Sequence, residues 1–183
     1  MATNNDKELT MKPLYLLLIP MLIIFLASCT LSPDHEEVMT GGVTDFSNKN
    51  APKKIDSKDI ESFRTWFVYP DEQGGYTRYD FAAEKQDDGT VELTWKLEDE
   101  ETTIVVGGEF LVSLQEVIDK HKLASYNGID KVTSGLPYEY EPSHLHCEYE
   151  SGEKINFYMD GNPESEWMGD FVELFSSVFP GVK

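Results

Sequence analysis

The heptapeptide VELTWKL, residues 91–97, decides the fold class of this chain. Its odd-numbered residues are apolar and its even-numbered residues are polar. Successive side chains of a β-strand point to opposite faces of a sheet, so this alternation predicts a strand with one buried face and one face in water. A strand of this kind needs partner strands beside it and a second layer over its apolar face.

The flanking sequence predicts three more strands. Alternating apolar residues fill 63–69, and after the turn residues 71–75 a second alternation places Tyr79 and Phe81 on one side. Residues 102–106 follow the polar stretch 98–101 and end at a glycine pair. Together with residues 91–97, these segments predict a run of four strands joined by short turns.

Two later segments have helical spacing. From Glu109 the apolar residues recur at intervals of three and four, and Asn127-Gly128 supplies the left-handed stop that a helix C-terminus favours. At 162–164, an asparagine offers a capping side chain, a proline suits the first helical position, and a glutamate lies near the positive helix end. An apolar stripe from Trp167 to Val178 follows, so the sequence predicts a second amphipathic helix.

A hairpin lies between the two predicted helices, around residues 150–152. A three-residue loop with Gly152 in the left-handed conformation would pair Cys147 with Ile155 and gather the apolar side chains on one face. The same register pairs Tyr149 with Glu153 and Leu145 with Phe157. A two-residue loop would instead set Ile155 opposite Glu148, so we favour the bulged loop.

The order of elements is therefore ββββαββα. It predicts an α+β fold, an antiparallel sheet with two helices packed on one face. We expect a single α+β domain over residues 57–183, preceded by a polar, flexible tether over residues 29–56.

Composition excludes some partners. The chain has 183 residues, 34 acidic against 15 basic side chains, and a formal net charge of -19. A polyanion would have to approach a polyanion, so nucleic acid is not an expected partner. The apolar content of 40% is too high for a disordered chain.

The N-terminus carries the most specific motif. An apolar run from Leu14 to Ala27 ends in Leu26-Ala27-Ser28-Cys29. This tetrapeptide resembles the lipobox of bacterial lipoproteins, in which the cysteine is lipidated and the leader is removed before it. The resemblance implies a signal peptide over residues 1–28, an acyl (palmitate) anchor on Cys29, and a place at the extracytoplasmic face of the cell membrane. Translation from Met1 and from Met11 are both compatible with this leader.

The C-terminal third adds a second resemblance. Residues 126–130, residues 149–155, and Gly161-Asn162-Pro163 with the aromatic helix behind it look like a domain of uncharacterised lipoproteins from Gram-positive gut anaerobes. The resemblance implies a location in the cell envelope. It carries no catalytic residue onto this chain.

One candidate metal site emerges from the predicted hairpin. His144, His146 and Glu148 fall on the face opposite the core, and residues two apart on a strand lie about 6 to 7 Å apart. Two imidazoles and a carboxylate could ligate zinc with a position left for water. An exposed strand face is also expected to be polar without any metal.

Other charged groups offer weaker candidates. Acidic turns at 71–72, 87–88 and 98–101 could gather to hold calcium or meet a cationic partner, and they are also typical of solvated turns. The two arginines, Arg64 and Arg78, could clamp a carboxylate or phosphate, or could pair with acids such as Asp80 or Glu61.

Nucleophilic catalysis finds little support. Cys147 is expected to point into the core, and no phosphate-cradling loop or Gly-x-Ser-x-Gly turn occurs.

We therefore expect a non-catalytic binding module for a peptide, glycan or cationic protein, with no cofactor beyond the lipid. An exposed aromatic surface from Tyr138, Tyr140 and Tyr158 would suit it. The alternatives are a metal-dependent hydrolytic enzyme using His144 and His146, and an accessory subunit of an envelope complex with an apolar patch on the uncovered sheet face.

Overall fold

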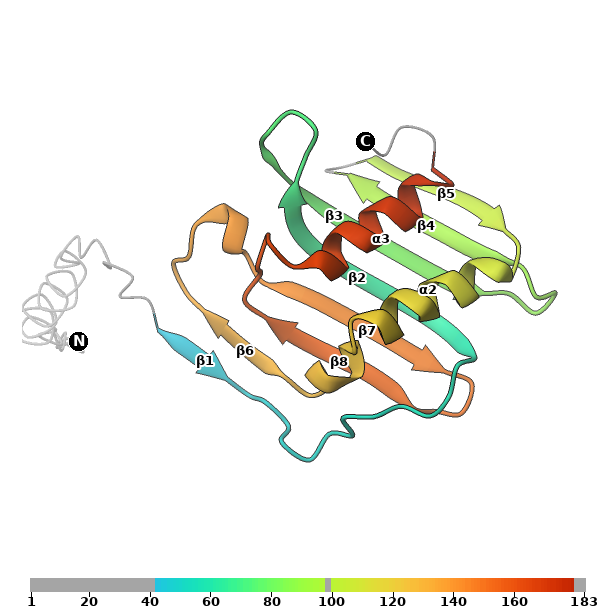
Figure 1. Ribbon diagram of the computed structural model, residues 1–183, viewed down its shortest axis with the longest axis horizontal. Helices are drawn as coiled ribbons and strands as arrows, with labels where there is room; N and C mark the ends of the chain where they lie inside the picture. The colour runs from blue at the N-terminus through green and yellow to red at the C-terminus, as the bar shows by residue number, and fades with distance from the viewer. Residues whose placement is uncertain (1–41, 98–99, 180–183) are drawn as a thin grey trace, which may run out of the picture. The chain divides into compact units, whose positions relative to one another are not determined.

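The computed structural model describes residues 42–97 and 100–179. These residues form an α+β fold of eight strands and two α-helices, and Figure 1 shows the strands side by side in one sheet. Two short 3-10 helices are also present. The strands are β1 (Val43–Asp45), β2 (Ile60–Pro70), β3 (Tyr76–Lys85), β4 (Val91–Leu97), β5 (Glu100–Val106), β6 (Asp130–Thr133), β7 (Ser143–Tyr149) and β8 (Lys154–Met159). The helices are α2 (Glu109–Lys120), α3 (Glu166–Ser176), and the 3-10 helices η1 (Leu123–Tyr126) and η2 (Tyr138–Tyr140).

The strand order across the sheet is β1-β6-β8-β7-β2-β3-β4-β5. The predicted four-strand run, β2 to β5, and the predicted hairpin, β7 and β8, are both present, and β7 pairs antiparallel with β2. The prediction of a purely antiparallel sheet and of the order ββββαββα is wrong in two places. Strands β1 and β6 were not predicted, and β6 runs parallel to β8.

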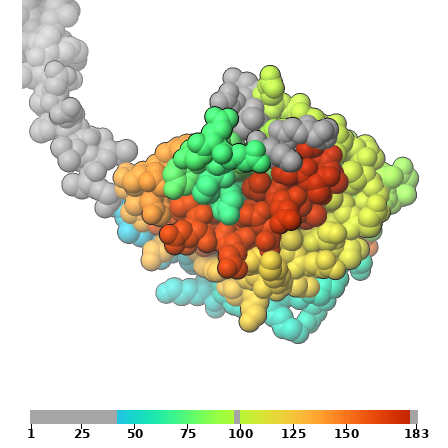
Figure 2. Space-filling model, turned by 45° about the horizontal axis from the view of Figure 1, so that its top comes forward, coloured from blue at the N-terminus to red at the C-terminus, as the bar shows by residue number. Residues whose placement is uncertain are grey.

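Both α-helices lie across one face of the sheet, as predicted (Figure 1). The space-filling view shows α3 and α2 lying next to each other over the strands (Figure 2). Beneath them lies an aromatic core. The ring of Phe175 on α3 stacks on Phe81 of β3 at 4.3 Å between centroids, and Trp167 meets Phe67 edge-on at 5.3 Å. Burial of these large rings supplies the apolar area that holds the two layers together.

The β7–β8 hairpin has the predicted register. Cys147 pairs with Ile155 and Leu145 with Phe157, and the Tyr149 N–H donates to the Glu153 carbonyl at 3.0 Å. Gly152 has φ of 81°, the left-handed conformation that the three-residue loop requires.

The helix boundaries differ from the predicted ones. Helix α2 ends at Lys120, and the chain then turns through Lys122 in the left-handed conformation into η1 before it reaches Asn127-Gly128. Helix α3 starts at Glu166, because the Asn162 side chain and carbonyl accept from the N–H groups of Glu164 and Ser165 and form a turn ahead of the helix. The capping signals thus belong to turns next to the helices.

The segment from residue 42 to 56 packs on the domain, which corrects the part of the expected tether that lies within the described residues. Strand β1 pairs with β6, Ile55 is buried, and the Asn127 side chain donates to the Pro52 carbonyl at 2.9 Å. The leader, Cys29 and the rest of the expected tether lie outside the described residues.

Candidate functional site

The face of the sheet opposite the two helices, called here the uncovered face, carries the polar half of each strand. Cross-strand pairing arranges these side chains in rows that cross the sheet. One row runs across six strands through Tyr158, His144, Trp66, Asp80, Lys96 and Glu101. The next row contains Asn156, His146, Arg64, Ala82, Thr94 and Thr103.

An aromatic and basic patch lies at the middle of the uncovered face. The Trp66 ring meets Tyr158 edge-on at 5.7 Å and lies 6.0 Å from the His144 ring. The guanidinium of Arg78 stands over Trp66, with Cζ 4.2 Å from the ring centroid. Such stacking favours Arg over Lys because the guanidinium is planar and weakly hydrated. With Arg64 on β2, both arginines of the chain belong to this patch.

A half-buried carboxylate lies between these cations. Burial raises the pKa of Asp80, while the positive charges of Arg78, Arg64 and Lys96 oppose that rise. Within the described ranges, no ion pair closer than 4.0 Å includes any of these three cations. The patch therefore keeps an excess of positive charge in a strongly acidic chain.

An acidic row lies on the other side of the patch. Glu148, Glu84 and Glu92 come from β7, β3 and β4, and Glu84 is directly opposite Glu92 in the register. Lys154 of β8 is opposite Glu148 at the end of this row. Like charges directly opposite each other on a sheet repel. The uncovered face thus offers positive and negative zones separated by two to four residues, about 7 to 13 Å along the strands.

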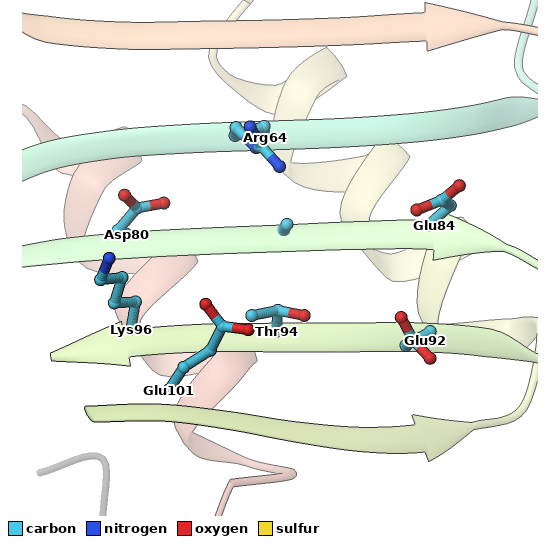
Figure 3. Close-up of a pocket in the computed structure, with 8 residues that line it drawn as sticks. Arg64, Asp80, Glu84, Glu92, Thr94, Lys96 and Glu101 are labelled. Atoms are coloured by element: carbon cyan, nitrogen blue, oxygen red, sulfur yellow. The ribbon is translucent and has the colours of Figure 1, made fainter. Parts of the chain in front are cut away.

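A hollow of about 380 Å³ joins the two zones. It forms because Ala82 at the centre of the face has only a methyl group between the longer side chains of Arg64 and Thr94. Figure 3 shows Asp80, Lys96 and Glu101 towards one end of the hollow, Glu84 and Glu92 towards the other, and Arg64 between them. The hollow is open to solvent and has mixed charge.

No protein-family model and no curated protein matches this chain. Among the described residues, no helix has both the length and the apolar character needed to span a membrane.

The structure places His144, His146 and Glu148 on the uncovered face, as predicted. His146 Nε2 lies 3.7 Å from Glu148 Oε2, and both imidazoles point a nitrogen at Asn156 Oδ1, at 3.2 Å from His144 and 3.3 Å from His146. Burial lowers the pKa of His144, which favours the neutral ring. Within residues 42–97 and 100–179, no group of three or more His, Cys, Asp or Glu side chains has the geometry of a metal site. The amide of Asn156 holds the two rings in place.

The acidic turns do not gather at one place. The turn with Asp87-Asp88 joins β3 to β4 and lies at the opposite end of the strands from the turn with Asp71-Glu72. Asp71 accepts from the N–H groups of Gln73 and Gly75, and Asp88 accepts from Thr90, so these carboxylates stabilise their own turns. Residues 98–99 of the third turn lie outside the described residues.

The remaining predicted candidates lie apart from the hollow. Cys147 is fully buried on the covered face, and burial raises the pKa of its thiol to about 12, which excludes it as an exposed nucleophile. Tyr158 belongs to the aromatic and basic patch, whereas Tyr138 and Tyr140 lie on η2, next to β2. In the two rows, Trp66 and Tyr158 are the only large aromatic side chains other than histidine, so these rows do not form the apolar patch expected of an envelope-complex subunit.

Sequence reasoning missed Trp66, Lys96 and Asn156 as members of the site, and named Asp80 only as an ion-pair partner of the arginines. Each occupies a polar-face position of a predicted strand, which was the available signal. Their convergence depends on the β2–β7 and β3–β4 registers across the sheet, which join strands that the sequence pattern alone does not align.

Proposed function

We propose that this protein is a non-catalytic binding module whose uncovered sheet face binds a polypeptide segment that carries both acidic and basic groups. The observation that carries the proposal is the pairing of the aromatic and basic patch with the acidic row on one open face. A uniform polyanion or polycation would meet repulsion in one of the two zones. A segment with charges of both signs meets complementary charge in each.

The shape of the site also favours binding over catalysis. The hollow is open, no buried nucleophile faces it, and its charged side chains come from rigid strands in the middle of the sheet. An extended segment of about four residues would reach from the aromatic and basic patch to the acidic row. Trp66 and Tyr158 offer flat apolar surfaces for one of its side chains.

Peptide binding by the full chain tests this function. The probe is a synthetic hexapeptide with two acidic side chains at one end, two basic ones at the other and an aromatic residue between. We expect saturable binding that weakens with salt and weakens at least threefold in the double variant Arg64→Gln with Arg78→Gln, and again in Glu84→Gln with Glu92→Gln. Lys131→Gln on β6 is the matched control and leaves binding unchanged.

The comparison peptides sharpen the result. All-acidic and all-basic hexapeptides of equal length bind more weakly if charges of both signs are recognised. Equal binding of all three peptides, or no saturable binding of any, would contradict the proposal. Binding of a neutral glycan that survives both double variants and is lost in Trp66→Ala would favour a glycan as the ligand.

We further propose that Cys29 anchors the module by acyl groups at the extracytoplasmic face of the cell membrane. The motif Leu26-Ala27-Ser28-Cys29 supports this proposal. Labelling of growing cells with a radioactive fatty acid should mark the wild-type chain and should fail for Cys29→Ser. An equally labelled variant would contradict lipidation at this cysteine.

A further inference from the structure

A second hollow, of about 360 Å³, lies away from the uncovered face. Its border joins three parts of the chain: the segment between β1 and β2, the C-terminal half of α2 with its link to η1, and the β7–β8 hairpin. In Figure 1 the first of these segments runs along the side of the sheet where η1 lies. Pockets that hold small ligands have volumes of roughly 300–1,000 Å³, so this hollow has an adequate size.

Four lysines border this hollow, which we call the lysine hollow: Lys53, Lys54, Lys58 and Lys122. Lys54 pairs with Asp56, and Lys58 pairs with Asp119 at 2.7 Å. Lys53 donates to the Asn127 carbonyl, and neither Lys53 nor Lys122 pairs with a carboxylate in the described parts of the chain. A chain with more than twice as many acidic as basic side chains thus leaves two cations uncompensated at one hollow.

The backbone at Lys122 adds a second unusual feature. Lys122 has φ of 53° and is the only residue other than glycine with a positive φ among the described residues. An L-residue adopts this conformation at an energetic cost, and such strain is concentrated at functional positions. Here it ends α2 and places Lys122 on the border of the lysine hollow.

The interior of the lysine hollow combines apolar walls with polar atoms that have no partner. Ile55, Ile118 and Ile155 line it. Tyr149 and Gln115 line it too, and both are more than nine-tenths buried. Among the described residues, neither the Tyr149 hydroxyl nor Gln115 Oε1 has a well-aligned hydrogen-bond partner, although Gln115 and the Cys147 thiol lie beside the hydroxyl. Gln115 Nε2 donates to Asp119 at 3.0 Å. Buried polar groups are almost always paired, so an unpaired donor at a hollow suggests an acceptor that a ligand supplies.

We propose that the lysine hollow binds a small amphipathic anion, a carboxylate or phosphate monoester attached to an apolar group. Lys53 and Lys122 hold its charge, the Tyr149 hydroxyl donates to one of its oxygens, and the isoleucines contact its apolar part. This site is independent of the peptide-binding face, because the two hollows share no lining residue.

The experiment titrates the isotope-labelled full chain with 3-phenylpropionate and follows the backbone amide resonances of the protein. The neutral ligand 3-phenylpropanamide tests whether binding needs the negative charge, and propionate tests whether it needs the apolar group. Phenyl phosphate tests the phosphate form of the same chemistry. We expect 3-phenylpropionate or phenyl phosphate to saturate a set of shifts around Lys122 and Tyr149, at least fivefold more tightly than the amide or propionate.

Variants then assign the contacts. Lys53→Gln with Lys122→Gln should weaken binding at least threefold, and the control Lys131→Gln should leave it unchanged. Tyr149→Phe should weaken binding and leave the thermal midpoint unchanged or higher, because it removes a hydroxyl to which no described residue offers a well-aligned hydrogen-bond partner. A drop in the midpoint for Tyr149→Phe, equal binding of the acid and its amide, or no saturable binding of either anion would each overturn the proposal.

Discussion

The two faces of the sheet are made by alternate residues of the same strands, yet different forces organise them. On β2, Phe63, Thr65 and Phe67 point to the helices and are almost wholly buried, whereas Arg64 and Trp66 point to the uncovered face and stay in contact with water. The covered face is filled by interlocking aromatic rings. On the uncovered face, no described residue forms an ion pair closer than 4.0 Å with Arg64, Arg78 or Lys96 around Trp66.

This difference separates stability from recognition in the same element. The covered face tolerates little change of volume, because its neighbours are packed at crystal-like density. The uncovered face can change its charges at a small cost to folding, since exposed charged groups contribute little to stability. The strands therefore supply a rigid frame from one face and a variable binding surface from the other.

Among the variants that test the difference between the two faces, Phe175→Ala is expected to have the largest effect on stability. Phe175 is fully buried and contacts Phe81, Phe110 and Phe63. Its loss should lower the free energy of unfolding by about 3–5 kcal/mol, measured by urea unfolding. Trp66→Ala on the uncovered face should cost clearly less despite removing a larger ring, and an equal cost would break the comparison.

A smaller effect is expected for the one polar side chain that β2 buries under the helices. Thr65 donates its hydroxyl to the His144 carbonyl at 2.8 Å. Thr65→Val keeps the shape and removes this bond, so it should cost about 1 kcal/mol in the same urea measurement. Thr94→Val on the uncovered face is the matched control and should stay within about 0.5 kcal/mol of the wild type.

A still smaller effect, of opposite sign, is expected for Asp80→Asn. Burial raises the pKa of Asp80 in the folded state, so between pH 3.8 and that raised pKa the folded state binds more protons than the unfolded state. Wild-type stability therefore falls as the pH rises through this window, and the penalty persists at neutral pH. Asp80→Asn should raise the thermal midpoint at pH 7, by less than Thr65→Val lowers it, and the gain should shrink towards pH 4.

The control for this variant is Glu72→Gln in the β2–β3 turn, for which no gain is expected. A loss of stability for Asp80→Asn at pH 7 would mean that attraction to Arg64, Arg78 and Lys96 outweighs the burial of the carboxylate.

The smallest effect on stability is expected for His144→Gln, and it appears only in the way that stability changes with pH. Burial lowers the pKa of His144 in the folded state below the ordinary value of 6.5. As the pH falls from 7 to 5, the unfolded state takes up a proton that the folded state resists, so the wild type loses stability. His144→Gln should lose less over this range than the wild type, as measured by thermal unfolding at each pH. The same change of slope in the control His146→Gln would not fit this explanation.

Much of the fold follows from local pattern. Alternation identified β2 to β4 and the β7–β8 hairpin, since each of these strands has one buried face and one wet face. Strand β5 buries no residue, and it was identified from its position between a polar turn and a glycine pair. Gly152 settled the hairpin register because its loop requires a left-handed residue. Two helices on one face then followed from their apolar stripes.

Strands β1 and β6 were not predicted, and the reason is physical. All three residues of β1 are exposed, and none of the four residues of β6 is buried, so neither strand alternates between buried and wet. Backbone hydrogen bonds and the buried side chain of Asn127 hold this edge. The Asn127 side chain donates to the Pro52 and Lys154 carbonyls and accepts from the Asn156 N–H. No periodic pattern in the sequence predicts these contacts.

The candidate sites were predictable only in part. The polar face of β7 gave His144 and His146, and the positions of Arg64 and Arg78 on neighbouring strands were foreseen. Their arrangement around Trp66 and Asp80 required the register between β2, β3 and β7. The lysine hollow could not be foreseen at all, because its residues come from segments that only the tertiary fold brings together.

The edge formed by β1 has a consequence for the local dynamics of the protein. Its amide hydrogens should exchange with solvent far sooner than those of β2 in the middle of the sheet, because β1 can detach without opening the aromatic core. If the opening extends to residue 53, it also removes Lys53 from the lysine hollow. A ligand there would then bind only the closed edge and slow its hydrogen exchange, which links occupancy of the hollow to the closing of the N-terminal border of the domain.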